Sequence, residues 1–332
     1  MPYITLFLVT LFLGTVMSLS GTHWVFVWLG LELNLLSFIP LLTSSTFFHS
    51  SDAAMKYFLA QALGSGLILL GATTMFISPF ISLPSYFPFL LFIGLLTKLG
   101  LPPCHFWFPS VMSMISWPLC ILLSTWQKLT PMLMLFTTLQ PTPMFFLTVC
   151  VILGALVGGL GGMNQTHLRP LLAYSSIGHM TWMLAASTVS ILSSLLYLFI
   201  YIITTIPLML LLNSSSSNSN ISSMNITSHT PLYSLNMLLL VCSLGGLPPL
   251  LGFFPKWLVI QSLSSSFTLI LFFTLLGSML NLYYYLNLIF INTLTPLKLP
   301  LIFLSSSSST PSIMPLVVTL TLGVSPSLLL FF

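Results

Sequence analysis

The sequence contains one pattern twice: residues 100–109 read Gly-Leu-Pro-Pro-Cys-His-Phe-Trp-Phe-Pro, and residues 246–255 read Gly-Leu-Pro-Pro-Leu-Leu-Gly-Phe-Phe-Pro. The two copies are offset by 146 residues at every matching position. Each double proline stands inside a long apolar stretch, and proline removes a helical hydrogen bond and collides with the preceding turn. We therefore expect two helices that are broken at equivalent places of an internal repeat.

The composition around these stretches is that of a membrane protein. Of 332 residues, 57% are apolar and 2% are charged, and the mean hydropathy is +1.11. Soluble domains carry roughly 25% charged residues, and disordered chains are poor in apolar residues. The chain is therefore expected to be an all-α polytopic membrane protein.

Dividing the chain at its polar, Pro-rich and Ser-rich segments predicts about eleven transmembrane helices of the required length of about 20 residues. Within a few residues, they are 3–20, 24–45, 54–78, 86–108, 117–138, 143–163, 169–188, 190–212, 231–260, 266–292 and 311–331.

The two proline-broken helices are then the fourth and the ninth, and an odd separation of five spans inverts the second copy relative to the first. Inverted repeats with broken helices are typical of secondary transporters and related ion-coupled proteins. We expect one membrane domain, 1–332, with a proton-translocating core over 23–290. Its five-helix repeat units are about 1–138 and 143–292, and 293–332 forms a C-terminal loop and the last helix.

The few basic residues of the loops predict an orientation. Lys56, Arg169 and Lys298 fall at connections on one side of the membrane, and the connections on the other side contain no Lys or Arg. By the positive-inside rule, this places the N-terminus inside. With eleven spans, the C-terminus lies outside.

Of the eight charged residues, four lie inside the expected spans and away from the connections: Glu32, Lys98, Lys128 and Lys256. A charge at the bilayer centre costs at least about 2.5–3.5 kcal/mol, so such residues usually face the bundle interior and mark ion or proton pathways. Lys98 precedes the first double-proline break, Lys256 follows the second, and Lys128 is near the centre of an unbroken fifth span.

These residues predict a proton relay. A nearby carboxylate favours the charged form of a lysine, so moving or neutralising that carboxylate can release the proton. We expect Glu32 and Lys98 to form a tunable pair, Lys128 to be the central relay and Lys256 the terminal donor. The alternative for each is a static ion pair or hydrogen bond.

Two histidines are weaker relay candidates. His105 stands beside the first break and His179 in the seventh span, and the side chain of histidine titrates near neutrality. A hydrogen-bonded histidine within the bundle is the alternative for both. Asp52 and Lys56, four residues apart, predict an interfacial ion pair at the start of the third helix.

Other chemistries find no support in the sequence. Six scattered basic residues make no patch for nucleic acid. The cysteines Cys104, Cys120, Cys150 and Cys242 lack the spacing of a metal, iron–sulfur or haem motif. We expect no cofactor, metal or redox centre on this chain.

The chain resembles the subunit-2 family of mitochondrial NADH dehydrogenase (respiratory complex I), a group of antiporter-like membrane subunits. The motifs that carry the resemblance keep the family's order and spacing between about residues 3 and 290. They are HWVFVWLGLELN at 23–34, KYFL at 56–59, TKLG at 97–100, HFWFP at 105–109, TWQKL at 125–129, GMNQT at 162–166, AYSSI at 173–177 and GLPP at 246–249.

The resemblance implies roles for individual residues. The family's carboxylate matches Glu32, and its buried lysines match Lys98, Lys128 and Lys256. Eleven helices correspond to a form that lacks three N-terminal helices of longer relatives. Ser110 is a departure, because many relatives carry an acidic residue there; we expect a changed surface charge near this helix end and no loss of the relay.

The resemblance also implies a setting. The complex oxidises NADH with ubiquinone and translocates protons, and NADH, FMN, iron–sulfur clusters and ubiquinone are bound by other subunits. The partners would be neighbouring antiporter-like and small membrane subunits and lipids, in the mitochondrial inner membrane with the N-terminus on the matrix side. Because the first apolar stretch has no basic residues before it, we expect no removable signal and synthesis inside the organelle.

Two other classes of function stay open from the residues alone. The inverted repeat also fits a freestanding cation/proton antiporter, although no acidic pair for a metal cation accompanies it. A structural spacer with static buried charges is the third possibility.

Overall fold

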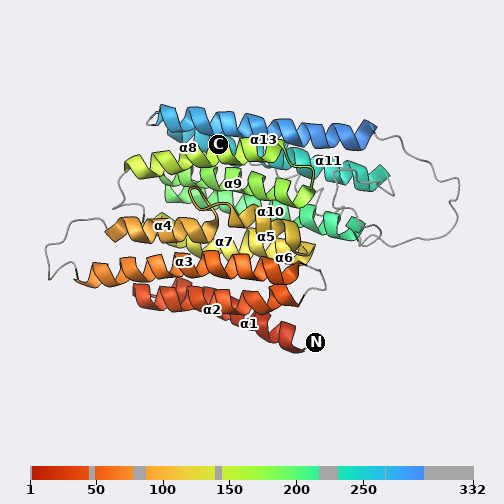
Figure 1. Ribbon diagram of the computed structural model, residues 1–332. Coiled ribbons are helices and arrows are strands. Elements are labelled where there is room, and N and C mark those ends of the chain that lie inside the picture. Colours follow the sequence, from red (N-terminus) through yellow and green to blue (C-terminus); the bar gives the residue numbers. More distant parts are fainter. Residues whose placement is uncertain are drawn as a thin grey trace.

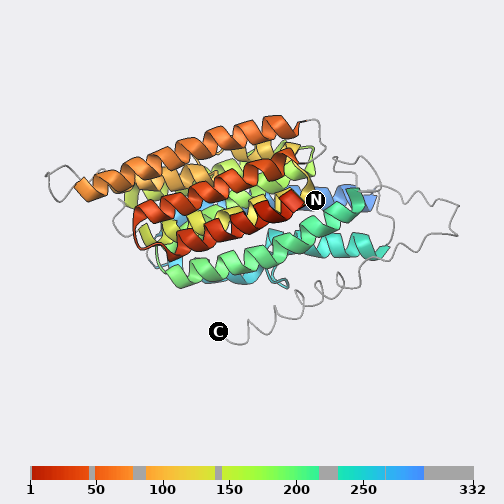
Figure 2. The same cartoon turned by 90° about the horizontal axis from the view of Figure 1, so that it is seen from below.

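The computed structural model of the chain is a bundle of helices that run side by side (Figures 1 and 2). It describes residues 2–44, 49–77, 87–138, 144–216, 231–265 and 267–294. Within these ranges every regular element is a helix. In chain order they are α1 (Pro2–Ser20), α2 (Trp24–Thr43), α3 (Ser50–Ile77), α4 (Phe87–Leu99), α5 (Trp107–Met114), α6 (Trp117–Ile121), the π-helical turn η1 (Leu122–Trp126), α7 (Gln127–Thr138), α8 (Met144–Met163), α9 (Leu168–Ser187), α10 (Ile191–Ser216), α11 (Pro231–Gly245), α12 (Phe253–Leu263) and α13 (Thr268–Leu294).

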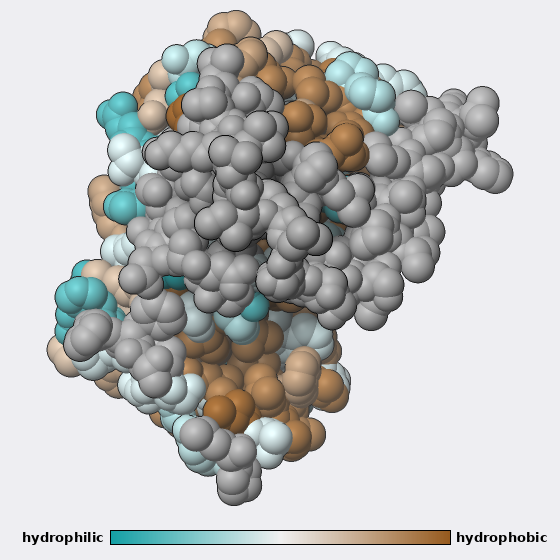
Figure 3. Space-filling model, turned by 90° about the vertical axis from the view of Figure 1, so that its right-hand side faces the viewer, coloured by the Kyte–Doolittle hydropathy of each residue, from teal (hydrophilic) through white to brown (hydrophobic). Residues whose placement is uncertain are grey.

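The outer surface of the bundle is that of a membrane protein. In the described part of the chain, seven helical segments are long and apolar enough to cross a membrane. Their outward faces carry side chains such as Leu63 and Leu192, which are 71% and 69% exposed and suit contact with lipid tails. Seen end on, from the right of Figure 1, hydrophilic side chains stand beside apolar ones (Figure 3). The chain therefore has a multi-pass, all-helical membrane fold.

Ten of the eleven expected spans coincide with a helix or with consecutive helices. The fourth covers α4 and only the start of α5, which continues to Met114, and the ninth covers α11 and most of α12. The eleventh, at 311–331, lies outside the described residues, as does Lys298. The count of eleven therefore stays a prediction.

The helix α4 stops at a glycine, two residues before the double proline. Gly100 has φ +71°, a conformation that glycine adopts without steric cost. Its N–H donates to the carbonyl of Thr97 at 3.2 Å, and the N–H of Leu101 donates to the carbonyl of Leu96 at 3.1 Å. This pair of bonds is the Schellman helix end, which leaves the chain free to begin α5 at Trp107.

The helix α11 ends in the same way. Gly246 has φ +79°, its N–H donates to the carbonyl of Ser243 at 3.1 Å, and the N–H of Leu247 donates to the carbonyl of Cys242 at 3.3 Å. In Figure 1, α4 begins at the left of the bundle and α11 at the right, so the two helices run in opposite directions.

We expected the fifth span to be an unbroken helix. It is continuous from residue 117 to residue 138 but is not α-helical throughout. The π-helical turn η1 separates α6 from α7. Pro131 lies within α7, and because proline has no N–H to donate, the hydrogen-bond pattern of this helix is interrupted again after Lys128. The irregular turn ends directly before Gln127 and Lys128, and such turns are frequent at functional sites.

Candidate functional site

The three lysines expected in the membrane are buried in the bundle. Lys98, Lys128 and Lys256 are 6%, 4% and 6% exposed. Each stands beside a helix irregularity: Lys98 in the last turn of α4, Lys128 after the π-helical turn, and Lys256 in the first turn of α12. Irregular backbone within a membrane occurs where it is buried in protein or lines a cavity. The three lysines are therefore close to backbone N–H and C=O groups that are not used in helical hydrogen bonds.

Glu32 and Lys98 form no direct ion pair. Glu32 is half-buried on α2, within electrostatic range of Lys98 on α4. In the part of the chain that the structure describes, the single ion pair within 4.0 Å is elsewhere, between His49 and Asp52. The pairing of Glu32 with Lys98 therefore stays a prediction.

The end of α4 is held by two side chains. Gln61 of α3 donates to the carbonyl oxygen of Lys98 at 3.1 Å, and the indole N–H of Trp107 donates to the carbonyl oxygen of Thr97 at 3.0 Å. These carbonyls belong to the last turn of a helix, where no intrahelical partner remains. Gln61 and Trp107 thus fix the turn that carries Lys98.

Lys98 and Lys128 line one small buried cavity, which has space for about one water molecule. The cavity is also lined by Tyr57 and by side chains that carry amide or hydroxyl groups: Asn34, Gln61, Gln127 and Thr130. Thr130 is fully buried, and its hydroxyl oxygen has no hydrogen-bond partner among the described residues. The two lysines therefore share a polar compartment.

Amide groups join the helices around this cavity. Gln127 Nε2 donates to Asn34 Oδ1 at 2.8 Å, and the hydroxyl of Tyr57 lies 3.4 Å from Gln127 Oε1. Asn34 and Tyr57 are 3% and 2% exposed. The contacts connect α2, α3 and α7 at the level of the two lysines.

On its other side, Lys128 contacts α9. Its ammonium donates to the hydroxyl of Ser176 at 3.1 Å and lies 4.3 Å from the ring centroid of Phe108 and 5.9 Å from that of Tyr201. A cation over an aromatic face is attracted by the ring quadrupole. Lys128 is thus held between the cavity and α9.

His179 lies within the electrostatic reach of both Lys128 and Lys256. It is 6% exposed, and its Nδ1 is 3.0 Å from the hydroxyl of Tyr197. Its Nε2 is buried and has no hydrogen-bond partner within the described ranges. This histidine is therefore within electrostatic range of two of the lysines, and its role in a relay stays a prediction.

Lys256 bridges the interruption between α11 and α12. Its ammonium donates to the carbonyl oxygen of Gly245, the last residue of α11, at 2.8 Å. A cation at a helix C-terminus is stabilised by the helix dipole. His105, by contrast, is 8% exposed and packs against Phe106 at 4.1 Å between ring centroids. Its buried Nδ1 has no hydrogen-bond partner in the described part of the chain, so its role stays a prediction.

The sequence interpretation assigned no role to several residues of this site. They are Asn34, Tyr57, Gln61, Gln127, Thr130, Ser176 and Tyr197. Two signals were available: a polar side chain inside an apolar span, as for Gln61, and adjacency to a predicted charge, as for Gln127 beside Lys128.

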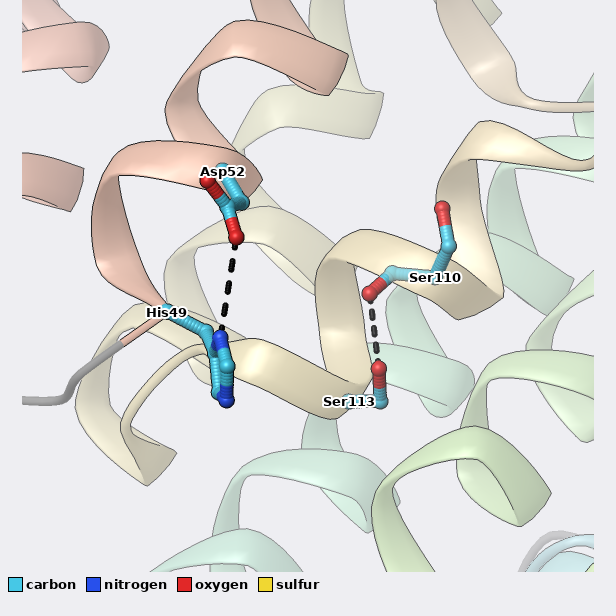
Figure 4. Close-up of polar contacts among 4 residues, drawn as sticks. All are labelled: His49, Asp52, Ser110 and Ser113. Atoms are coloured by element: carbon cyan, nitrogen blue, oxygen red, sulfur yellow. Dashed lines mark hydrogen bonds and ion pairs between the residues drawn. The ribbon is translucent and has the colours of Figure 1, made fainter.

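The predicted pair of Asp52 with Lys56 is wrong. Asp52 instead pairs with His49, with 3.6 Å between Oδ2 and Nδ1 (Figure 4). Both side chains are largely exposed, at 62% and 72%, and exposed ion pairs contribute too little to dictate one geometry. Ser110 donates to the carbonyl oxygen of Trp107 at 2.8 Å, within its own helix.

The described residues contain no group of three or more His, Cys, Asp or Glu side chains placed to hold a metal ion.

Comparison with known proteins agrees with this fold. Residues 21–281 match the family described as NADH:quinone oxidoreductase/Mrp antiporter, TM. The chain is 39% identical to NADH-ubiquinone oxidoreductase chain 2 of Lumbricus terrestris, over 99% of this chain and 98% of the relative. It is 38% identical to the protein of that name from Oryctolagus cuniculus, over 96% of each.

Two solved structures of respiratory membrane complexes contain chains with the same fold. A chain of respiratory complex I from Thermus thermophilus aligns with a TM-score of 0.80 and 26% identity, over 97% of this chain and 78% of that one. A chain of the membrane-bound sulfane sulfur reductase, an archaeal respiratory membrane complex, shares the fold with a TM-score of 0.82 and 15% identity, over 98% and 73%. The chain therefore belongs to the NADH:quinone oxidoreductase/Mrp antiporter membrane family and, within it, to the family of NADH-ubiquinone oxidoreductase chain 2 proteins.

Proposed function

We propose that the chain is a core membrane subunit of proton-pumping NADH:ubiquinone oxidoreductase and carries protons through its buried lysines. The family membership supports the place in the enzyme. The observation that carries the mechanism is the arrangement of the three lysines: Lys98 and Lys128 line one cavity, and His179 lies in the field of both Lys128 and Lys256.

The relay begins at Glu32 and Lys98. A change in the charge or position of the Glu32 carboxylate alters the preference of Lys98 for its protonated form. Lys98 and Lys128 exchange a proton across their shared cavity. Lys128 then passes it toward Lys256 through the region of Ser176 and His179, whose buried Nε2 accepts or donates a proton according to its tautomer.

The breaks in α4 and α11 supply the polar surroundings that this relay needs. Each helix is followed directly by a glycine with positive φ, and each has carbonyl groups in its last turn that Gln61 or Lys256 binds. The opposite directions of α4 and α11 support an inverted repeat with units of about 1–138 and 143–292. The 23–290 core within a single membrane domain, 1–332, is proposed on the same ground.

The proposed setting is the mitochondrial inner membrane, with the N-terminus on the matrix side and the C-terminus on the intermembrane-space side. Lys56 is exposed on α3, and Arg169 stands in the first turn of α9, in agreement with a positively charged inner side. NADH, FMN, the iron–sulfur clusters and ubiquinone are bound by other subunits. Neighbouring antiporter-like and small membrane subunits cover parts of the apolar surface, and lipids cover the rest.

A mild-detergent native gel of the source membrane, probed for this chain and stained for NADH oxidation, tests the place in the enzyme. The chain should migrate with a very large NADH-oxidising band. A small band without that activity would contradict the proposal and favour a freestanding antiporter, which sodium-dependent pH changes in proteoliposomes of the chain alone would then reveal.

The relay is tested in the assembled enzyme with Lys98→Ala. We expect NADH oxidation with fewer protons moved per NADH. Full proton pumping in this variant would remove Lys98 from the mechanism.

A further inference from the structure

Gln127 is placed to connect the two lysines of the first half. It is the first residue of α7 and directly precedes Lys128. Its side chain lines the cavity that Lys98 and Lys128 share. The proposed relay assigns no role to the amide of Gln127.

Both ends of the Gln127 amide have a partner on another helix. Nε2 donates to Asn34 Oδ1 at 2.8 Å, and Oε1 lies 3.4 Å from the hydroxyl of Tyr57. A primary amide has two donor hydrogens and one acceptor oxygen, so the two contacts engage one end of the amide with α2 and the other with α3.

The bond to Asn34 joins the helices that carry the charges. Asn34 is two residues beyond Glu32 on α2, and Gln127 is one residue before Lys128 on α7. The α7 side of this bond is not regular: the π-helical turn η1 ends at Trp126, and Pro131 lies in α7. Because irregular segments have fewer helical hydrogen bonds to restrain them, a direct bond between the two helices has a large share in setting the position of Lys128.

The bond between Gln127 and Asn34 lies beside the cavity that Lys98 and Lys128 share, because both amide side chains line it. Thr130, one turn after Gln127, lines the same space and carries a fully buried hydroxyl with no hydrogen-bond partner among the described residues. Buried polar groups beside a space of this size bind ordered water. Gln127 and Thr130 therefore line the cavity that both lysines share.

We propose that Gln127 is a positioning residue that transmits the state of the Glu32–Lys98 pair to Lys128 through its hydrogen bond to Asn34. The inference rests on the proposed function. When α2 shifts in response to the charge at Glu32, the bond moves the start of α7 with it. Lys128 then turns toward or away from the cavity and exchanges its proton with Lys98.

The test uses the assembled enzyme in its membrane, with three variants. Gln127→Met removes both amide hydrogen bonds at nearly constant size. The exchange variant Asn34→Gln/Gln127→Asn restores an amide pair of the same total length. Gln261→Met is the matched control, because Gln261 is an exposed glutamine on α12.

We expect Gln127→Met to assemble and to pump protons at least about threefold to tenfold more slowly, because the loss of each hydrogen bond has an effect of about this size. Fewer protons should move per NADH oxidised. The exchange variant should recover most of the pumping, and Gln261→Met should behave as the unmodified enzyme. Recovery distinguishes positioning from simple packing, since the exchange retains the bond but not the original side chains.

Unchanged pumping in Gln127→Met, or loss of pumping that the exchange leaves uncorrected, would overturn the inference. If Gln127→Met does not assemble, Asn34→Leu decides in its place. It has a similar size, removes the acceptor of the Gln127 hydrogen bond and adds no charge, so normal pumping in it would contradict the proposal and slowed pumping would support it. Lys128→Met separates this result from the proposed function: if Lys128→Met pumps normally, the relay itself is wrong.

Discussion

The ammonium nitrogen of Lys256 lies 2.8 Å from the carbonyl oxygen of Gly245, across the break between α12 and α11. Position 110 is the counterpart of position 256 in the repeat, at the offset of 146, and a serine stands there. Ser110 bonds within its own helix, and Gln61 binds the end of α4 instead. The two breaks thus have the same backbone but different capping side chains, and a lysine caps only the second.

Gly246→Ala should destabilise the second break. An added Cβ would lie 2.8 Å from the ammonium of Lys256, and a non-glycine residue at φ +79° costs roughly 1–2 kcal/mol. We expect faster thermal inactivation of the enzyme and slower pumping. Gly66→Ala is the control, since an added Cβ meets no atom within 4 Å there; equal stability of the two variants would show that the contact with Lys256 is unimportant.

Lys128→Met should abolish pumping through this chain while the enzyme still assembles. The apolar side chain has a similar length and leaves no buried charge, which is costly in a membrane. Proton movement and NADH oxidation measured together in sealed vesicles give the readout. Lys56→Met, at an exposed lysine of α3, should leave both unchanged. Assembly loss without any change in protons per NADH would instead favour a spacer role.

Ser176→Ala should make the protonated form of Lys128 less stable. The hydroxyl of Ser176 accepts from its ammonium at 3.1 Å, and hydrogen bonds to charged groups are worth about 1.5–3 kcal/mol. We expect pumping to fall about tenfold or more. Ser113→Ala removes a similar hydroxyl from an exposed position and should have no effect; a rate in Ser176→Ala that matches it would contradict the role of this bond.

Tyr197→Phe should alter the transfer between the two halves. It removes the hydroxyl that lies 3.0 Å from Nδ1 of His179 and that orients this ring and its tautomer. Slower pumping, with the enzyme still assembled, is the expected result. Tyr283 is 57% exposed, so Tyr283→Phe is the matched control, and identical pumping in the two variants would remove His179 from the route.

Much of the fold follows from local patterns. A charge content of 2% and apolar stretches of membrane length predict a polytopic helical protein, because a helix that satisfies its own backbone is the structure that such stretches adopt in lipid. The repeated Gly-Leu-Pro-Pro marks both helix interruptions, since glycine alone adopts positive φ freely and proline cannot continue the hydrogen bonds. The π-helical turn before Lys128 could not be predicted from this pattern, because its residues, Leu122–Trp126, include no proline or glycine.

The sequence by itself determined which residues carry the charge. Glu32, Lys98, Lys128 and Lys256 stand out because an ionisable side chain in an apolar span is costly wherever it lies on the helix. Only the tertiary structure decided which of them meet. The shared cavity of Lys98 and Lys128 and the bond between Gln127 and Asn34 join residues from different helices, and the way helices pack leaves no local signal in the chain. The pairing of Asp52 with His49 instead of Lys56 was decided at the same level, because at an exposed helix end neighbouring partners differ too little in energy for spacing alone to choose between them.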